Sequence, residues 1–130
     1  MDRVSIEKLP ETKEIDGAKR WNEGRGEFAQ ISYLEDIGHV AVFELKRGYS
    51  RGSHFHKEKE EVFYVVSGRI RAVFMDVDTG KREGHVLEKG HRIRVRTGVA
   101  HIFYGVDDAL VVEYSPQYYD KKDTHPVDFG

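Results

Sequence analysis

The 130-residue sequence contains no cysteine, and it lacks both a long apolar run and an excess of one charge. Without cysteine the chain forms no disulfide, no thiolate metal site and no thiol nucleophile. Its 21 Lys and Arg residues nearly balance its 23 Asp and Glu residues, so a nucleic-acid partner is not expected. No apolar stretch approaches the roughly 18 residues of a membrane span, and no charged-then-apolar leader opens the chain. We therefore expect a soluble, cytoplasmic protein without a membrane partner.

Alternation of apolar and polar residues, the period of a β-strand, recurs from residue 28 to residue 116. Glycine-containing turns separate the alternating segments, and no helical periodicity is sustained there. Short strands with turns about every 8–12 residues predict an all-β antiparallel sandwich or barrel. We expect one domain, residues 1–130, with a barrel core at about residues 28–116 behind an irregular N-terminal segment. The predicted strands are 28–34, 40–45, 62–66, 70–75, 92–96 and 110–114.

Two of these strands carry predictions about orientation. Segment 92–96 places three arginines on one face and two β-branched residues on the other, which predicts one wet and one buried face. In segment 110–114, Tyr114 shares a face with Leu110 and opposes Glu113. If Glu113 faces solvent, Tyr114 points into the barrel.

Three histidines and one glutamate stand in a spacing that β-strands can bring to one point. His54 and His56 alternate and so share a face, Glu61 opens the next predicted strand, and His101 follows a turn at Gly98. Taken singly, each of these residues is equally consistent with a structural role, and the charged turn before Glu61 is equally consistent with a solvated turn. Together, three imidazoles and a carboxylate form a ligand set for a divalent metal such as Zn, Fe, Ni or Mn. The remaining histidines are expected to be structural: His39, His85, His91 and His125.

The same residues fall into two motifs that resemble those of the cupin superfamily. The first is Gly48-x5-His54-x-His56-x4-Glu61-x6-Gly68, and the second is Gly90-x5-Arg96-x-Gly98-x2-His101. Two positions depart from the family pattern: Arg96 replaces the usual proline, and Gly105 the usual asparagine. Neither departure removes a metal ligand. The resemblance implies a cupin jelly roll or conical antiparallel β-barrel, a homodimer, and a site in the barrel mouth.

Shorter segments resemble cupins that act on nucleotide sugars. Arg51-Gly52-Ser53-His54 is similar to the RGxH segment of the dTDP-4-dehydrorhamnose 3,5-epimerases, and 98–103 to their GxAHxF segment. Extended to Lys57, the first segment resembles the 3,4-ketoisomerases of 4-keto-6-deoxysugars. These resemblances imply a sugar or nucleotide-sugar isomerase or epimerase that moves a proton next to a carbonyl, with motif histidines such as His54 and His56 as acid and base and without a metal.

Two further residues are candidates for that chemistry. The segment 113–120 is similar to the end of the epimerase barrel, where a catalytic tyrosine lies, although the spacing from Tyr114 to Tyr118 is one residue short. Tyr114 would donate a proton, or else be an ordinary inward aromatic. Arg51 would pair with a diphosphate or sugar oxygen, or else be a rim residue in a surface ion pair.

A metal and free-base catalysis compete for the same histidines. If His54 and His56 hold a metal, neither is a free base, and catalysis becomes Lewis-acid polarisation of a substrate oxygen. We expect a metal-binding sugar isomerase or epimerase. The alternatives are an Fe(II)-dependent dioxygenase, which this ligand set also suits, and a barrel that binds a small ligand without turning it over.

Overall fold

The computed structural model describes residues 1–118 and 120–130 of the chain. The strands are β1 (Val4–Lys8), β2 (Lys19–Glu23), β3 (Gly26–Gln30), β4 (His39–Leu45), β5 (Ser50–Phe55), β6 (Glu61–Ser67), β7 (Arg69–Asp76), β8 (Arg82–Glu88), β9 (His91–Val95), β10 (Val99–Gly105), β11 (Ala109–Ser115) and β12 (His125–Pro126). The one helical element of the described residues is the 3-10 turn η1 (Lys121–Asp123), and no helix among them is long and apolar enough to cross a membrane.

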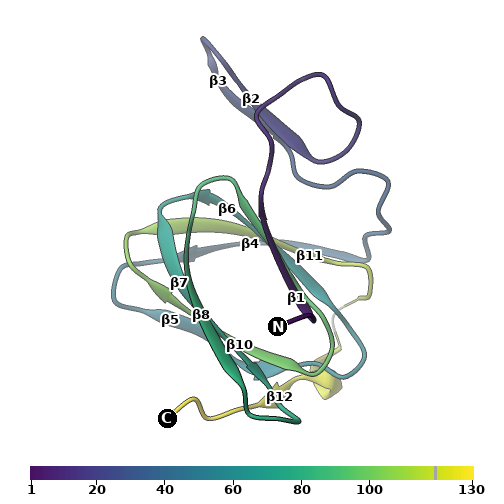
Figure 1. Ribbon diagram of the computed structural model, residues 1–130, viewed down its shortest axis with the longest axis vertical. Coiled ribbons are helices and arrows are strands. Elements are labelled where there is room, and N and C mark those ends of the chain that lie inside the picture. The colour runs from purple at the N-terminus through teal and green to yellow at the C-terminus, as the bar shows by residue number, and fades with distance from the viewer. Residues whose placement is uncertain (119) are drawn as a thin grey trace.

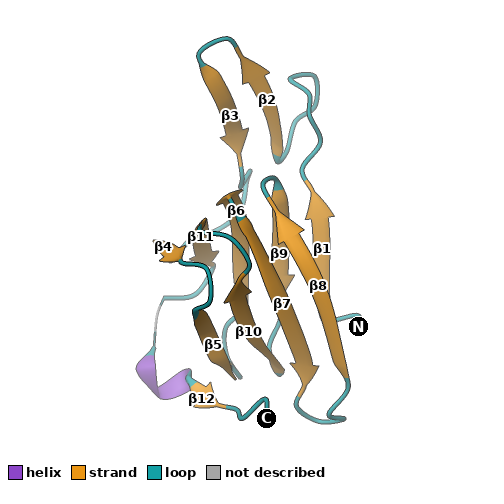
Figure 2. Cartoon of the chain, turned by 90° about the vertical axis from the view of Figure 1, so that its left-hand side faces the viewer, coloured by secondary structure: helices purple, strands orange, loops and turns teal. Residues whose placement is uncertain are grey.

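Two five-stranded antiparallel sheets pack face to face, as Figures 1 and 2 show. The strand order is β1-β9-β6-β11-β4 in the first sheet and β12-β5-β10-β7-β8 in the second. The chain passes repeatedly from one sheet to the other; for example, β6 lies in the first sheet and β7 in the second. The predicted all-β jelly roll is confirmed, and over residues 1–118 and 120–130 the sheets are not joined into a closed barrel.

The core lies between the sheets, where alternate residues of each strand point inward. Phe63 of β6 meets Phe103 of β10 edge-on, with 4.8 Å between the ring centroids, so this pair joins the two sheets. Both side chains also line the pocket described below. The apolar core, whose burial is the main source of stability, therefore forms the floor of the functional site.

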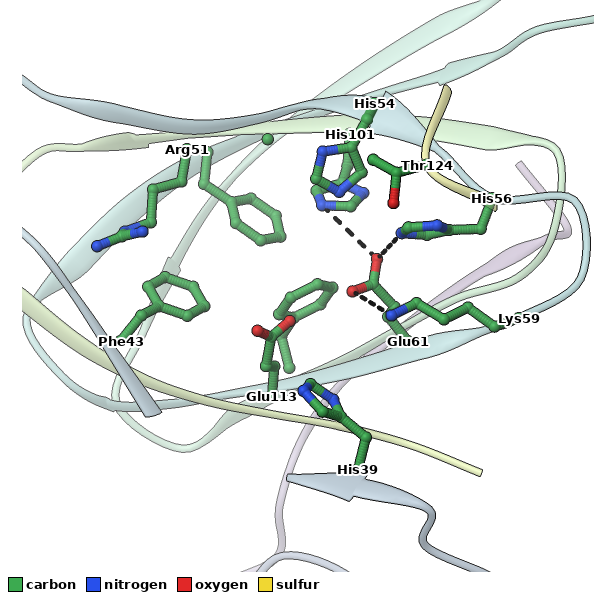
Figure 3. A pocket seen from close by; sticks show the side chains of 13 residues that line it. His39, Phe43, Arg51, His54, His56, Lys59, Glu61, His101, Glu113 and Thr124 are labelled. Carbon is green, nitrogen blue, oxygen red and sulfur yellow. Dashed lines mark ion pairs between the residues drawn. The ribbon is translucent and has the colours of Figure 1, made fainter. Parts of the chain in front are cut away.

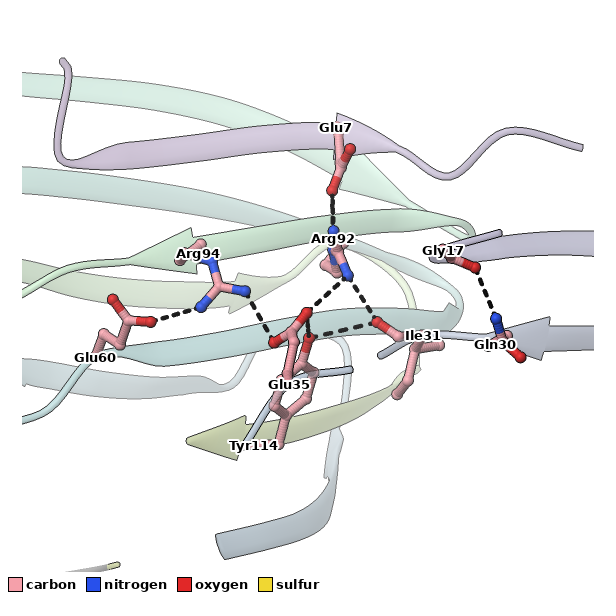
Figure 4. A network of polar contacts seen from close by, with 9 residues as sticks. All are labelled: Glu7, Gly17, Gln30, Ile31, Glu35, Glu60, Arg92, Arg94 and Tyr114. Carbon is pink, nitrogen blue, oxygen red and sulfur yellow. Dashed lines mark hydrogen bonds and ion pairs between the residues drawn. The ribbon is translucent and has the colours of Figure 1, made fainter. Parts of the chain in front are cut away.

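The outer face of the first sheet is covered at β9 rather than wet. Arg92 and Arg94 of β9 are only 17% and 22% exposed, because the loop that contains Ile31 and Glu35 lies over them (Figure 4). Arg92 donates to the carbonyl of Ile31 at 2.9 Å, and Glu35 accepts an ion pair from each arginine. Arg94 also pairs with Glu60 at 2.6 Å. The prediction of a solvent-facing arginine strand is wrong for these two residues, since loop carboxylates cover and neutralise them.

The N-terminal segment that we expected to be irregular contains β1, β2 and the first residues of β3, whose remainder falls in the predicted strand 28–34. β1 pairs antiparallel with β9 at the edge of the first sheet. β2 and β3 form a hairpin that projects from the two-sheet body (Figures 1 and 2). Trp21 and Phe28 stack across this hairpin with 4.5 Å between their ring centroids. The sheets therefore begin at residue 4, well before the expected core.

Gly105 shows why the chain departs from the family motif at this position. A Cβ atom on residue 105 would lie 2.3 Å from the carbonyl oxygen of Lys46. The turn between β4 and β5 is bonded directly to this residue, because Gly105 accepts from the N–H of Gly48 and donates to the carbonyl of Tyr49. The close approach of this turn thus requires glycine at position 105.

Candidate functional site

A pocket of about 400 Å³ opens between the two sheets and contains all of the predicted metal ligands (Figure 3). β5 and β10 form one wall, and β4, β6 and β11 form the other. The residues that line it are His39, Phe43, Arg51, Gly52, His54, His56, Lys59, Glu61, Phe63, His101, Phe103, Glu113 and Thr124.

His54, Glu61 and His101 converge at the end of this pocket. Each offers one ligand atom, and these atoms all lie within 4.8 Å of one another. The strands explain the convergence, because His54 and His101 are register partners on β5 and β10 while Glu61 begins β6 in the facing sheet. Glu61 and His101 are buried, at 5% and 3% exposure. The predicted convergence of these three residues is therefore found in the structure.

His56 completes the cluster from the position just after β5. Its Nδ1 lies 2.8 Å from the carbonyl oxygen of Asp123, and because a carbonyl only accepts, Nδ1 carries the proton. In the neutral ring this leaves a lone pair on Nε2, which lies 2.9 Å from Oε1 of Glu61. When the His56 ring is protonated, these two buried atoms are each other's partner, because Nε2 then donates to the carboxylate. A divalent cation that replaced this proton would meet the Nε2 lone pair and the carboxylate oxygen together, so the four residues suit a divalent metal.

The electrostatics of the cluster keep His54, Glu61 and His101 in metal-binding form. Burial lowers the pKa of His101 to about 4 and also lowers the pKa of His54. Burial alone would raise the pKa of Glu61, but the neighbouring His56, His101 and Lys59 lower it to about 2. Burial opposes protonation of His56, yet the Glu61 carboxylate raises its pKa above the usual value. At neutral pH the cluster thus presents an ionised carboxylate and neutral His54 and His101, as metal ligation requires, while a metal on His56 has to displace a proton that Glu61 favours.

Three titratable residues of the pocket were not predicted from the sequence: Lys59, His39 and Glu113. Lys59, expected in a solvated turn, is 4% exposed, and its Nζ lies 3.8 Å from Oε2 of Glu61. His39, expected to be structural, lines the pocket from β4. Its signal was available, because His39 and Phe43 share a face of one strand by period two. Lys59 had no such signal, since it lies in the loop before β6. The other three histidines lie outside the pocket: His85, His91 and His125.

The predicted inward orientation of Tyr114 is wrong, and Glu113 takes the inward position. Ala109 and Val111 of β11 face the core, so alternation turns Glu113 into the pocket and Tyr114 to the outer face. There the Tyr114 hydroxyl donates to Oε1 of Glu35 at 3.2 Å (Figure 4). Tyr114 is buried beneath the covering loop and not within the site, so it does not donate a proton in the pocket.

Tyr114→Phe is therefore expected to weaken the fold and spare the site. Loss of the hydroxyl bond to Glu35 lowers the free energy of unfolding by about 1 kcal/mol. Urea unfolding measures this change, and calorimetric titration with Zn²⁺ is expected to give an unchanged affinity. A large loss of metal affinity with an intact fold would contradict the outward position of Tyr114.

Glu113 has an unusual pKa because of its place in the pocket. Burial and the adjacent Glu61 carboxylate raise the pKa of Glu113 from 4.5 to about 7. A carboxyl group that binds its proton more tightly in the folded state costs stability as pH rises from the unfolded pKa through the folded one. Glu113 therefore destabilises the metal-free fold at pH 8 and not at pH 5.

Glu113→Gln is expected to remove this pH-dependent cost. In the presence of chelator, the variant should be more stable than the unsubstituted protein at pH 8. We expect this difference in the free energy of unfolding to be about 1 kcal/mol larger at about pH 8 than at about pH 5, a value reduced for the solvent screening of a half-buried group. Urea titrations at the two pH values measure the difference. A gain that does not depend on pH would show that Glu113 is ionised throughout.

Arg51 lies on the boundary between the main pocket and a second cavity. Its Nε donates to the carbonyl of Glu44 at 3.0 Å, and its guanidinium stacks over Phe43 at 5.2 Å from the ring centroid. The second cavity, also about 400 Å³, is lined by Arg51 together with Lys46 and Tyr49. The predicted substrate-binding arginine thus reaches both spaces.

Comparison with known proteins gives one family and a group of related folds. The family described as polysaccharide biosynthesis C-terminal domain matches residues 21–125. The UDP-2-acetamido-2,6-beta-L-arabino-hexul-4-ose reductase of Pseudomonas aeruginosa is 28% identical over 128 residues, which cover 94% of this chain and 34% of that enzyme. The chain thus spans about a third of the length of this curated relative.

Two solved structures show the same fold. The dTDP-4-dehydrorhamnose 3,5-epimerase of Sulfolobus tokodaii is 20% identical, with a TM-score of 0.76 over 87% of this chain and 75% of that chain. A 3,4-ketoisomerase of Thermoanaerobacterium thermosaccharolyticum, solved with TDP-4-keto-6-deoxyglucose, is 15% identical, with a TM-score of 0.76 over 95% and 87%. The predicted resemblance to cupins of these two kinds is confirmed at the level of fold.

Proposed function

Because the chain belongs to the polysaccharide biosynthesis C-terminal domain family, we propose that it is a metal-binding cupin that isomerises or epimerises a nucleotide-linked sugar by proton transfer next to a carbonyl. The observation that carries this proposal is the convergence of three imidazoles and a carboxylate in one pocket, where Nε2 of His56 lies 2.9 Å from Oε1 of Glu61. The similar proteins support the substrate class, because their names describe enzymes that modify nucleotide sugars.

His54, Glu61 and His101 would hold the metal, with His56 as a fourth ligand. A bound divalent metal would supply Lewis-acid polarisation of a substrate oxygen. The Asp123 carbonyl holds the His56 ring in the tautomer that points a lone pair at the site.

The proton-transfer groups would lie on the opposite wall of the pocket. Glu113 and His39 line it from β11 and β4, facing the histidine cluster across the cavity (Figure 3). We assign removal and return of the proton beside the carbonyl to the Glu113 carboxyl group, with His39 beside it. The buried ammonium of Lys59 would stabilise the negative charge that develops on the substrate oxygen. In a metal-free enzyme, His54 and His56 would instead be the acid and base.

Arg51 and the second cavity support a substrate larger than a free sugar. A sugar in the main pocket would place a diphosphate near the Arg51 guanidinium, and the cavity beyond it contains Lys46 and the exposed ring of Tyr49. A cation for the diphosphate and an aromatic surface for a base are what a nucleotide requires.

A thermal-shift screen of UDP- and dTDP-linked sugars against matching sugar phosphates tests this proposal. We expect a nucleotide sugar to raise the melting temperature and to exchange a carbon-bound proton in D₂O when it carries a ketone. No stabilisation by any nucleotide sugar would contradict the substrate class. Oxygen uptake by the Fe(II)-loaded protein would favour the dioxygenase, and a shift without proton exchange would favour a binding module.

We also propose that the chain forms a homodimer through the region from β3 to β4. Six of the exposed large apolar side chains lie in this part of the chain, and β4 is an unpaired edge of the first sheet among the described strands. Light scattering after gel filtration tests the assignment, with Val42→Lys expected to shift a dimer towards monomer. A monomeric unsubstituted protein would contradict it. The six residues are Phe28, Tyr33, Leu34, Ile37, Val40 and Val42.

A further inference from the structure

The C-terminal segment 120–127 borders the candidate site, although it lies far from the motif residues in sequence. β12 pairs with the end of β5, so that His125 and Pro126 are register partners of Phe55 and His54. Beyond this pairing, Val127 donates to the carbonyl of Ser53 at 2.8 Å. The segment is thereby attached to the strand that carries the first histidine of the cluster.

Asp123 fixes the segment on its other side. Its carboxylate accepts from the backbone N–H groups of Lys57 and Glu58, at 2.8 and 3.0 Å, and its carbonyl accepts from His56. The Asp123 side chain is 7% exposed. Residue 124 is therefore held between two anchored neighbours, Asp123 and the β12 pair.

Thr124 turns its hydroxyl into the pocket from this position. Figure 3 shows the hydroxyl pointing into the cavity between His54 and His56. Oγ1 is fully buried and has no hydrogen-bond partner within the described part of the chain. A buried hydroxyl without a partner costs free energy, and a ligand oxygen in the cavity would recover it.

We propose that Thr124 is a specificity-determining residue that hydrogen-bonds an oxygen of the bound sugar. This assignment rests on the proposed function and sharpens it, because it requires a hydroxyl or carbonyl of the sugar beside the histidine cluster, on the side that the C-terminal segment covers. The nucleotide part, placed beyond Arg51, makes no contact with Thr124.

Thr124→Val tests this contact, because valine keeps the shape of threonine and removes the hydroxyl. Calorimetric titrations would compare UDP-N-acetylglucosamine, chosen because the curated relative is named for a UDP-2-acetamido sugar, with UDP alone. We expect the variant to raise the Kd for the nucleotide sugar about tenfold and to leave the Kd for UDP unchanged. Thr124→Ser, which keeps the hydroxyl, should remain close to the unsubstituted protein.

Failure of the Thr124 contact and failure of the proposed function give different results in these titrations. Equal affinity of Thr124→Val and the unsubstituted protein for the nucleotide sugar would overturn the Thr124 contact and leave the proposed function standing. An equal loss for UDP and the nucleotide sugar would overturn it too, because that pattern reports a displaced segment. If the unsubstituted protein bound neither compound, the proposed function and the contact would both fail. Unchanged melting temperature and Zn²⁺ affinity would confirm that the variant folds normally.

Discussion

Glu61→Gln is expected to lower the affinity of the protein for Zn²⁺ by more than about 100-fold. This loss exceeds the one usually caused by removing a residue that only hydrogen-bonds a metal ligand. Oε1 of Glu61 lies 2.9 Å from Nε2 of His56 and 3.9 Å from Nε2 of His101, so it is at the centre of the cluster. Glutamine keeps the shape of the side chain and removes its charge. The remaining imidazoles are neutral donors and do not replace a lost anion.

The matched control is Glu58→Gln, the same chemical change three residues earlier on an exposed side chain. Calorimetric titration of both variants with Zn²⁺, at a pH where both are folded by circular dichroism, compares them directly. The control should bind as the unsubstituted protein does. If Glu61→Gln bound Zn²⁺ with the same affinity, Glu61 would not be a ligand, and its low pKa would reflect only its pairing with His56 and its other buried neighbours.

Gly68→Ala is expected to lower the free energy of unfolding by more than about 3 kcal/mol, a large part of the total for a small domain. Gly68 has a φ of +79° in the turn that carries the chain from β6 to β7. A Cβ atom there would lie 2.2 Å from the carbonyl oxygen of Asp108 and 2.7 Å from Cα of Ala109. Both contacts are with backbone, so no side chain can move aside to relieve the overlap.

Gly80→Ala separates the two sources of this cost. Gly80 has nearly the same φ, +75°, but a Cβ atom there would meet no atom within 4 Å. Its substitution should cost only the left-handed backbone strain, about 1 kcal/mol. Urea unfolding of the two variants measures the difference. Equal losses would show that strain alone, and not the approach of the β10–β11 connection, requires glycine at position 68.

Spacing predicted the centre of the site well because the relevant contacts follow strand periodicity. His54, Glu61 and His101 lie on strands whose alternation and glycine turns are visible in the sequence, and the fold brings these strands together. The same periodicity could not orient β11. Alternation shows that Glu113 and Tyr114 lie on opposite faces of β11. Because both faces of this strand are covered, a buried tyrosine fits either face, and the sequence could not show which residue points into the pocket.

Residues contributed by non-local pairing were beyond prediction from local pattern. β1 has only five residues, and its partner β9 lies more than eighty residues away. Thr124 lies at the pocket because the neighbouring Asp123 carboxylate accepts a hydrogen bond from the backbone N–H of Glu58, sixty-five residues earlier in the chain. Neither contact has a local sequence signature, whereas the strands of the core are short, regular and separated by clear turns.

The metal content of protein purified without chelator or an added histidine tag tests the central claim most directly. Elemental analysis is expected to find about one divalent transition metal per chain, lost in Glu61→Gln and retained in Glu58→Gln. Protein that contains no metal, and whose melting temperature does not respond to Zn²⁺, Fe²⁺, Ni²⁺, Mn²⁺ or EDTA, would contradict the account. His54 and His56 would then be free to act as acid and base.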